Sequence, residues 1–163
     1  MTLAELNQLE PAQAADEFRR CCGSSRWTAA MTASRPFASL DAMRAKGDEI
    51  WASLGQDDWL EAFAAHPKIG EQGPVSAWSE AEQSGMQSAG DDARAKLAVL
   101  NAEYEARFGY IFIVCATGKS PTEMLAMLRW RMANEPAREL PIAAEEQRRI
   151  AGLRLARLVD EHE

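Results

Sequence analysis

A regular succession of helix start and stop signals is the feature that most constrains the fold of this chain. Pro11 opens a helical stretch that Gly23 closes, which is the usual asymmetry between the two ends of a helix. Ser39 stands before a further stretch and Gly55 follows it. Between such signals the apolar residues recur at helical spacing. The chain is therefore predicted to be almost entirely helical.

The expected helices follow one another with short connections. Ser120, Pro121 and Glu123 form a capping-box arrangement at the start of one of them. In another, Leu97 and Tyr104 share one face. The predicted helical segments are residues 3–9, 11–22, 25–34, 40–54, 57–65, 79–86, 91–108, 120–134 and about 140–160.

Two segments interrupt the helices. Residues 68–78 contain two glycines and a proline and are expected to form a loop. Residues 110–116, "YIFIVCA", form a compact apolar run that is either a buried extended piece or a helix, because periodicity does not distinguish the two. No repeat or flexible linker divides the chain. We expect one all-α domain over residues 1–163, with one short apolar connecting segment.

Composition and charge narrow the class of protein. The formal net charge of −7 argues against nucleic acid and anionic membrane surfaces as partners. No apolar run is long enough to span a membrane, and the N-terminus lacks the features of a signal peptide, so a cytoplasmic location is expected. Cys21, Cys22 and Cys115 are expected to be thiols in a reducing compartment, since neighbouring cysteines pair poorly. With one interior histidine and no C-x-x-C spacing, no structural metal is expected.

His66 is the first candidate for a catalytic or binding residue. The following proline disfavours helical dihedrals at His66, so a helix ends there and the imidazole projects into the glycine-bearing loop. One interpretation is a functional ring that faces a cleft. The other is a C-terminal histidine that interacts with the last carbonyls and the helix dipole. The residue pattern leaves both open.

A second cluster lies in "WSEAEQSG". Ser79 and Glu82 have capping-box spacing, and Gln83 follows directly. The free N–H groups of a helix N-terminus also make an anion-binding site. These side chains can therefore line a pocket while their backbone begins a helix, and both interpretations can hold together.

Two further features are open to a structural or a functional interpretation. The 110–116 run is expected in the core, where its main-chain groups could also hold a polar heterocycle. Cys115 is expected to pack there rather than act as a nucleophile. Arg154 shares a helical stripe with Ile150 and Leu158, so its guanidinium needs a carboxylate from the protein or from a ligand.

Together these segments resemble the OHCU decarboxylase family, whose members decarboxylate 2-oxo-4-hydroxy-4-carboxy-5-ureidoimidazoline (OHCU) in urate breakdown. The matching segments, in order, are "HPKIG", "SEAEQSG", "LNAEYEARFGYIFIVCATGKSPTEML" and "LRWRMANE". The resemblance implies a carboxy-lyase that forms (S)-allantoin and CO2. It also implies a metal-free and cofactor-free helical fold, usually a homodimer, with an anionic ureidoimidazoline as substrate.

The resemblance also implies roles for individual residues. His66 would be the catalytic acid/base and Glu82 its partner carboxylate. Arg154 would approach the ligand. The remaining residues implied in substrate binding are Pro67, Ser79, Glu80, Ala81, Gln83, Phe112, Ile113, Val114, Cys115 and Ala116.

This chain departs from the family pattern in a few respects. The loop between His66 and Ser79 is short, so we expect a different lid over the site. The peroxisomal tail of the vertebrate members is missing, which fits a cytoplasmic enzyme. The hydroxyisourate hydrolase domain that is fused to some relatives is not expected in this sequence.

Two alternatives remain open. The chain could be a non-catalytic helical binding module, which would require damage at His66, Glu82 or Arg154. It could also be a metal-assisted amidohydrolase that uses His66, Glu71 and Glu82, and a chelator would separate this activity from decarboxylation.

Overall fold

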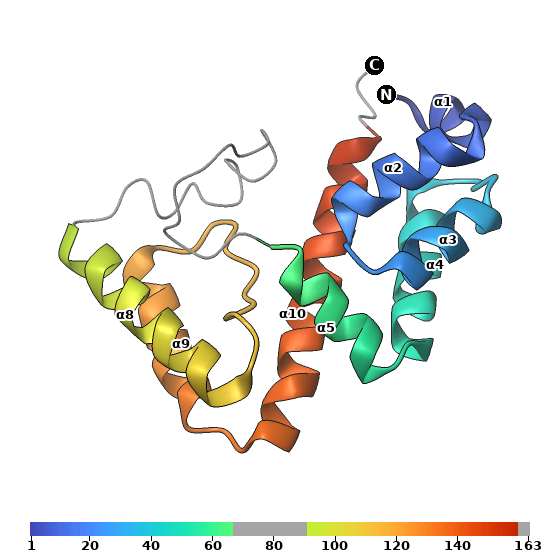
Figure 1. Cartoon of the computed structure of the whole chain (residues 1–163). Helices are drawn as coiled ribbons and strands as arrows, with labels where there is room; N and C mark the ends of the chain where they lie inside the picture. Colours follow the sequence, from blue (N-terminus) through green and yellow to red (C-terminus); the bar gives the residue numbers. More distant parts are fainter. Residues whose placement is uncertain (67–90, 160–163) are drawn as a thin grey trace. The chain divides into compact units, whose positions relative to one another are not determined.

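The computed structural model describes residues 1–66 and 91–159, and within them all regular secondary structure is helical (Figure 1). The predicted all-α fold class is confirmed for these residues. The predicted helix 79–86 lies outside the described residues. The helices are α1 (Leu3–Gln8), α2 (Pro11–Cys21), α3 (Ser25–Ser34), α4 (Leu40–Ser53), α5 (Gln56–Ala64), α8 (Asp91–Phe108), α9 (Pro121–Met132) and α10 (Pro136–Leu158).

Local capping explains why most helices begin where they do. The Thr2 hydroxyl accepts from the Glu5 amide at 3.1 Å, and the Glu5 carboxylate accepts from the Thr2 amide at 3.2 Å, which completes a capping box for α1. Ser39 and Ser120 accept in the same way from the third residue of α4 and of α9. These N-termini confirm the predictions from sequence.

Several helix ends lie one or two residues from their predicted positions, and at two boundaries the interpretation itself differs. Gly55 is the N-cap of α5, where its amide donates to the Asp58 carboxylate at 3.2 Å, rather than the residue that ends α4. Helix α10 begins at Pro136, one turn before the predicted start near Leu140, and it carries Pro141 in its interior. Both prolines lack an amide proton, so Pro136 suits a first turn, whereas Pro141 leaves the Ala137 carbonyl without its helical donor.

Internal packing divides the chain into two units. Unit 1 comprises Met1–Ala65 with Gln147–Glu163, and unit 2 comprises His66–Glu146, so α10 contributes to both. The expectation of a single all-α domain over residues 1–163 stays a prediction. Each unit has its own hydrophobic core.

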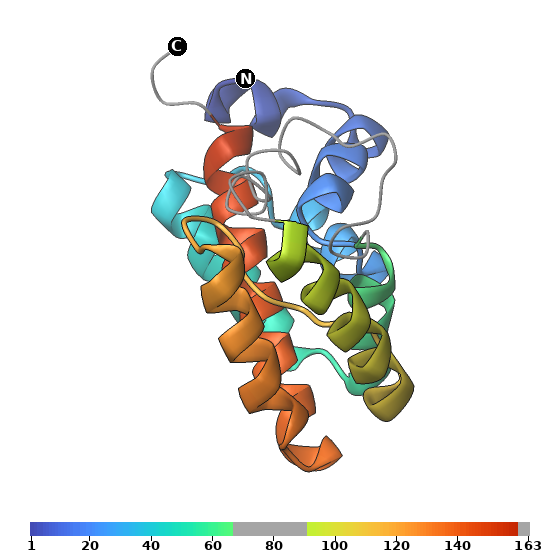
Figure 2. The same ribbon diagram turned by 90° about the vertical axis from the view of Figure 1, so that its left-hand side faces the viewer.

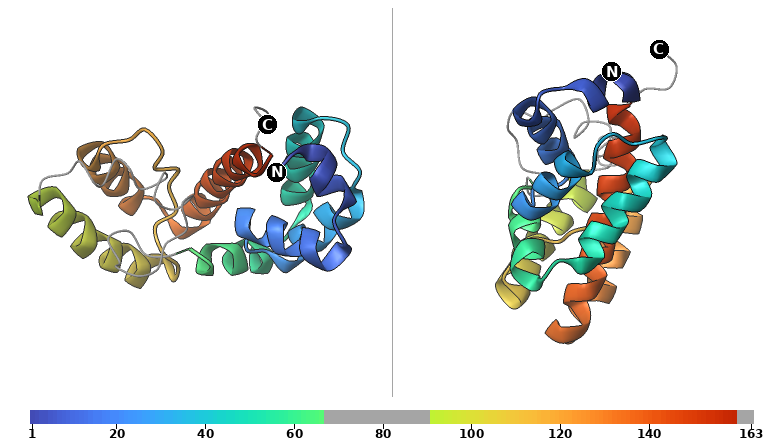
Figure 3. Two further views of the ribbon diagram at one scale, coloured as in Figure 1. Left: turned by 90° about the horizontal axis from the view of Figure 1, so that it is seen from above. Right: turned by 90° about the vertical axis from the view of Figure 1, so that its right-hand side faces the viewer.

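Part of the core of unit 1 forms where α3, α4 and the last turns of α10 meet (Figure 3). The Trp27 indole N–H donates to the Gly47 carbonyl at 3.1 Å. A Cβ atom on Gly47 would lie 3.4 Å from both the Trp27 ring and the Leu155 side chain, so a glycine allows these helices to approach closely. The buried stripe of α4 is therefore Met43, Gly47 and Trp51.

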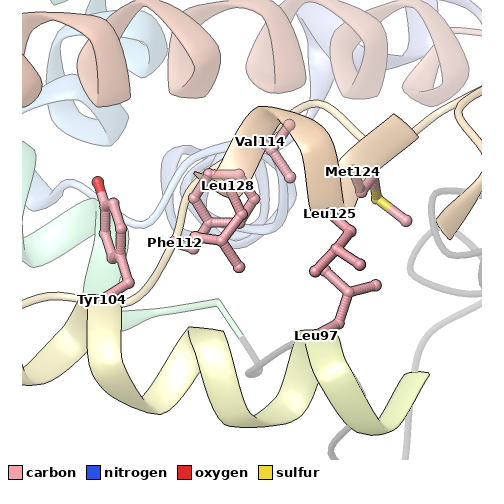
Figure 4. Close-up of a cluster of buried hydrophobic side chains, with 7 residues drawn as sticks. All are labelled: Leu97, Tyr104, Phe112, Val114, Met124, Leu125 and Leu128. Carbon is pink, nitrogen blue, oxygen red and sulfur yellow. The ribbon is translucent and has the colours of Figure 1, made fainter. Parts of the chain in front are cut away.

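The core of unit 2 lies between α8, α9 and the connection that joins them (Figure 4). Leu97 and Tyr104 face it from α8, as the sequence predicts. Residues 110–116 contain no helix or strand and run as coil (Figure 2), in which residues 112–115 are buried. Gly109 and Gly118, with φ of +88° and +78°, make the turns at its two ends. The cluster is formed by Leu97, Tyr104, Phe112, Val114, Met124, Leu125 and Leu128.

Two smaller predictions can be checked within the described chain. None of its helices combines the length and the apolar character needed to cross a bilayer. All three cysteines are buried thiols, which confirms that Cys21 and Cys22 do not form a disulfide.

Candidate functional site

His66 follows the C-terminus of α5 and is partly buried. Ala65 caps the helix in the αR conformation, with its amide directed at the carbonyls of Ala62 and Phe63. The helix therefore ends where the sequence predicts, immediately before the His66–Pro67 pair. The packing of the last turn of α5 within unit 1 therefore holds the residues directly before His66.

Gly23 makes close contact with the end of α5. A Cβ atom on Gly23 would lie 2.4 Å from the Ala65 Cβ and 3.7 Å from the Ala62 carbonyl oxygen. No side chain fits there unless the backbone shifts, so Gly23 serves close packing. Gly23 also follows the C-cap residue Cys22 directly, which confirms the prediction that this glycine closes the helix; its close packing against α5 is not visible in the sequence.

Glu61 ties the same helix to the start of α3. Its carboxylate accepts from the Ser25 hydroxyl at 2.6 Å and from the Ser25 amide at 2.9 Å. The hydroxyl bond and then the amide bond hold the pKa of Glu61 below its usual value. The connection between α2 and α3 is thus the fixed support for the residues that precede His66.

Arg154 reaches the last turn of α2 from α10. Its Nη1 donates to the Arg20 carbonyl at 3.4 Å, and the side chain is partly buried. Burial raises the pKa of Cys22 to about 12 and raises that of Cys21 as well, while the positive charge of Arg154 opposes both shifts. Within unit 1, Arg154 and Ala65 therefore both contact the stretch from Arg20 to Gly23.

The segment Phe112 to Ala116 is buried except for Ala116, which is partly exposed. Three of its main-chain groups are bound by side chains of unit 2. The Ile113 carbonyl accepts from Arg131 at 2.6 Å, the Cys115 amide donates to Glu146 at 3.2 Å, and the Cys115 carbonyl accepts from Lys119 at 2.6 Å. The core prediction is confirmed for the buried side chains.

A buried polar network that the sequence analysis did not identify surrounds this segment. Arg131 donates to Glu139 from Nε at 2.7 Å and from Nη2 at 2.6 Å. The Tyr104 hydroxyl donates to the same carboxylate oxygen, and Asn134 donates to the other at 2.9 Å. Burial and the bond to Glu139 raise the pKa of Tyr104 far above its usual value.

The position of Arg131 on an apolar helical stripe is the sequence feature that could have revealed this network. Arg131 lies seven residues after Met124 and three after Leu128, on the buried stripe of α9. The argument that singled out Arg154, an arginine on an apolar stripe, applies equally to Arg131. The flanking arginine, Arg129, is exposed.

The remaining expected site residues lie outside the described residues: Pro67, Ser79, Glu80, Ala81, Glu82 and Gln83, together with Glu71 of the amidohydrolase alternative. Across residues 1–66 and 91–159, no group of three or more His, Cys, Asp or Glu side chains is arranged to hold a metal ion.

Comparison with known proteins gives one consistent family. The family model described as OHCU decarboxylase matches residues 7–156. The uric acid degradation bifunctional protein TTL of Arabidopsis thaliana is 41% identical over 150 residues, which is 88% of this chain. The chain spans 46% of the length of that plant protein. The 2-oxo-4-hydroxy-4-carboxy-5-ureidoimidazoline decarboxylase of Haloferax volcanii is 30% identical over 96% of this chain and 95% of its own.

Solved structures agree with the sequence comparison. The fold matches a crystal structure of OHCU decarboxylase in the presence of (S)-allantoin with a TM-score of 0.81 and 39% identity, over 90% of this chain and 99% of the other. A crystal structure of (S)-allantoin synthase matches with a TM-score of 0.72 and 23% identity, over 98% of this chain and 55% of the other, and it supports the fold alone. From the family match, and from the two reported proteins that are named as decarboxylases, we conclude that this chain belongs to the OHCU decarboxylase family.

Proposed function

We propose that this protein decarboxylates OHCU to (S)-allantoin and CO2 in urate degradation. The observation that carries the proposal is the match, at 39% identity over nearly the whole neighbour, to an OHCU decarboxylase crystallised in the presence of (S)-allantoin. The named relatives in urate degradation point to the same pathway. We further propose that residues 1–163 act as one functional domain, as a cytoplasmic homodimer.

The substrate brings its own electron sink. Its C4 carries a carboxylate and a hydroxyl, and C5 beside it forms a C=N bond. When the bond from C4 to the carboxylate breaks, its electron pair forms a C4=C5 double bond and the C=N nitrogen takes a proton. The enol hydroxyl then loses its proton and C5 gains one, which gives allantoin. The protein therefore needs to orient the substrate and to transfer protons, and no additional electron acceptor is required.

In this proposal His66 transfers the protons. An imidazole with an ordinary pKa near 6.5 exchanges protons at neutral pH, and it can remove the hydroxyl proton or deliver a proton to one face of C5. Delivery to one face accounts for a single allantoin enantiomer. Glu82 is proposed to orient the imidazole or to hold the hydroxyl and ureido groups.

Substrate binding is assigned to the other residues of the family motifs. Arg154 would pair with the substrate carboxylate through its guanidinium. The main chain of residues 112–116 would hold the ring, and its buried side chains would keep water from the reacting carbon. Residues 67 and 79–83 would complete the site.

A direct assay tests the function. OHCU is generated in place from urate by the two enzymes that precede this step, because the compound is short-lived. The protein is added, and circular dichroism then follows the appearance of optically active allantoin. We expect a rapid signal of one sign, whereas a racemic product that forms at the rate of the buffer control would contradict the proposal.

A further inference from the structure

Arg131 contacts the 112–116 segment in two ways. Its Nη1 donates to the Ile113 carbonyl at 2.6 Å, and its guanidinium carbon lies 4.5 Å from the centre of the Phe112 ring. The side chain is only 6% exposed. A planar guanidinium held by a carbonyl at one edge and an aromatic face below fixes the direction of that carbonyl.

The guanidinium is itself held by Glu139, which is fully buried. Two nitrogens of Arg131 bond to one carboxylate oxygen, while Tyr104 and Asn134 donate to this carboxylate from α8 and from the turn after α9. Every partner restricts the arginine to one conformation. The position of the Ile113 carbonyl is therefore defined by several helices of unit 2 at once.

The neighbouring main-chain groups are held as well. Glu146 binds the Cys115 amide at 3.2 Å and Lys119 binds the Cys115 carbonyl at 2.6 Å. Between these fixed points lies Val114, whose side chain is 7% exposed and packs in the core (Figure 4). Among the described residues, the main-chain amide and carbonyl of Val114 have no hydrogen-bond partner.

We propose that Arg131 is a positioning residue that sets this segment for substrate: it fixes the Ile113 carbonyl so that the amide and carbonyl of Val114 receive the ring. The inference rests on the proposed function, in which residues 112–116 hold that ring. A donor and an acceptor on one residue match the N–H and C=O groups of a cyclic urea. Buried main-chain groups need partners, and the substrate supplies them.

Stability alone does not account for a buried ion pair at this place. Taking a guanidinium and a carboxylate out of water is costly, and apolar residues of similar volume often stabilise a core equally well. The ion pair does give directional contacts that an apolar pair lacks. Its two expected effects, on stability and on geometry, can be separated by substitution.

The test compares Arg131→Met with a double variant that combines Arg131→Met and Glu139→Gln, both in the urate-coupled assay. The single variant leaves a buried carboxylate without its cation, so it melts at a lower temperature. The double variant removes both charges. The introduced amide oxygen still accepts from Tyr104, and the new NH2 group donates to the Asn134 side-chain oxygen once that amide turns over, so much of the thermal stability returns. The Ile113 carbonyl still lacks its donor, and we expect kcat/KM to remain about 10- to 100-fold below wild type with a raised KM.

Arg107→Met is the matched control. Arg107 also donates to a main-chain carbonyl, that of Asn134 at 2.7 Å, and lies 5.0 Å from the centre of the Phe108 ring, but neither contact involves the 112–116 segment. We expect wild-type kcat and KM from this variant. If the double variant also has wild-type kcat/KM, Arg131 is purely structural and the inference is wrong. If Arg131→Met does not fold, the double variant still decides. Lack of activity in the wild-type chain would contradict the proposed function instead.

Discussion

Gly23 lies so close to Ala65 that a Cβ atom on the glycine would come within 2.4 Å of the alanine Cβ. Ala65 is the residue directly before His66. This contact packs the residues after α2 against the end of α5. Two hydrogen bonds between Ser25 and Glu61 connect the start of α3 to the same helix. The α2–α3 connection therefore holds the end of α5, directly before His66.

Gly23→Ala tests this contact. The added methyl group forces the two helix ends apart, and overpacking of this kind costs about 1–3 kcal/mol of unfolding free energy. We also expect a lower kcat/KM, because the shift reaches His66. Urea unfolding and the coupled assay measure the two effects. Gly55→Ser is the control, since nothing lies within 4 Å of a Cβ there and serine suits an N-cap; equal losses in both variants would contradict a specific contact.

Glu61→Gln tests the charge in the same support. The folded-state pKa of Glu61 lies below its ordinary value of 4.5, so its stabilising effect is present above pH 4.5 and is lost as the pH falls through the lower folded value. The unfolding free energy of Glu61→Gln should therefore lie below wild type near neutral pH, and the difference should shrink as the pH falls below 4.5. Ser25→Ala, which removes the main cause of the shift, should flatten the pH dependence in the same way. A difference that does not change with pH would contradict this account.

The raised pKa values of the adjacent thiols Cys21 and Cys22 predict that the folded protein loses stability at alkaline pH. Burial raises the pKa of Cys22 from 9.0 to about 12 and that of Cys21 even further. Since the unfolded thiols ionise near 9.0, the stabilisation is complete below that pH and is lost as the pH rises through the folded-state values. We expect Ellman's reagent, applied below that pH, to react at once with all three thiols in denaturant and only at the slow rate of unfolding in the native protein. Rapid native reaction at Cys21 and Cys22 would rule this out.

His66→Ala tests the proposed acid/base. General acid–base catalysis contributes about 10²–10⁴-fold, so the variant should form allantoin at close to the rate of buffer. The side chain is only partly buried, and we expect a melting temperature close to wild type. His162→Ala, at the other histidine of the chain, should retain full activity. Substantial activity in folded His66→Ala would refute the assigned role. A chelator that abolishes wild-type activity would favour the amidohydrolase alternative.

The sequence predicted what local rules control. Helix starts at Thr2, Ser39 and Ser120 depend on a hydroxyl three residues from an amide, and that spacing is visible in the letters. Gly55 was assigned to the wrong helix because a glycine between two helices suits both an end and a start. The buried stripe through Gly47 was also hidden, since a glycine carries no apolar side chain to reveal a helix contact.

The site was less predictable, because its order comes from residues far apart in sequence. Nothing local relates Gly23 to Ala65 or Arg131 to Ile113; each pair depends on tertiary packing. Periodicity did not show whether residues 110–116 form a helix or extended chain. The turns at Gly109 and Gly118, both with positive φ, separate this coil from α8 and α9. The family resemblance supplied the roles of His66 and Arg154, which spacing alone left open.

Among the residues that the structure describes, no strand pairs with the coil between α8 and α9. Side chains of Arg131, Glu146 and Lys119 take the place of a strand's ladder. Main-chain bonds to a neighbouring strand do not depend on which side chains are present, whereas each of these bonds is lost when one residue is substituted. Substitution of one of these side chains therefore changes the support of one main-chain group and leaves the others in place. Related enzymes can in this way differ in ligand preference although the sequence of the coil is the same.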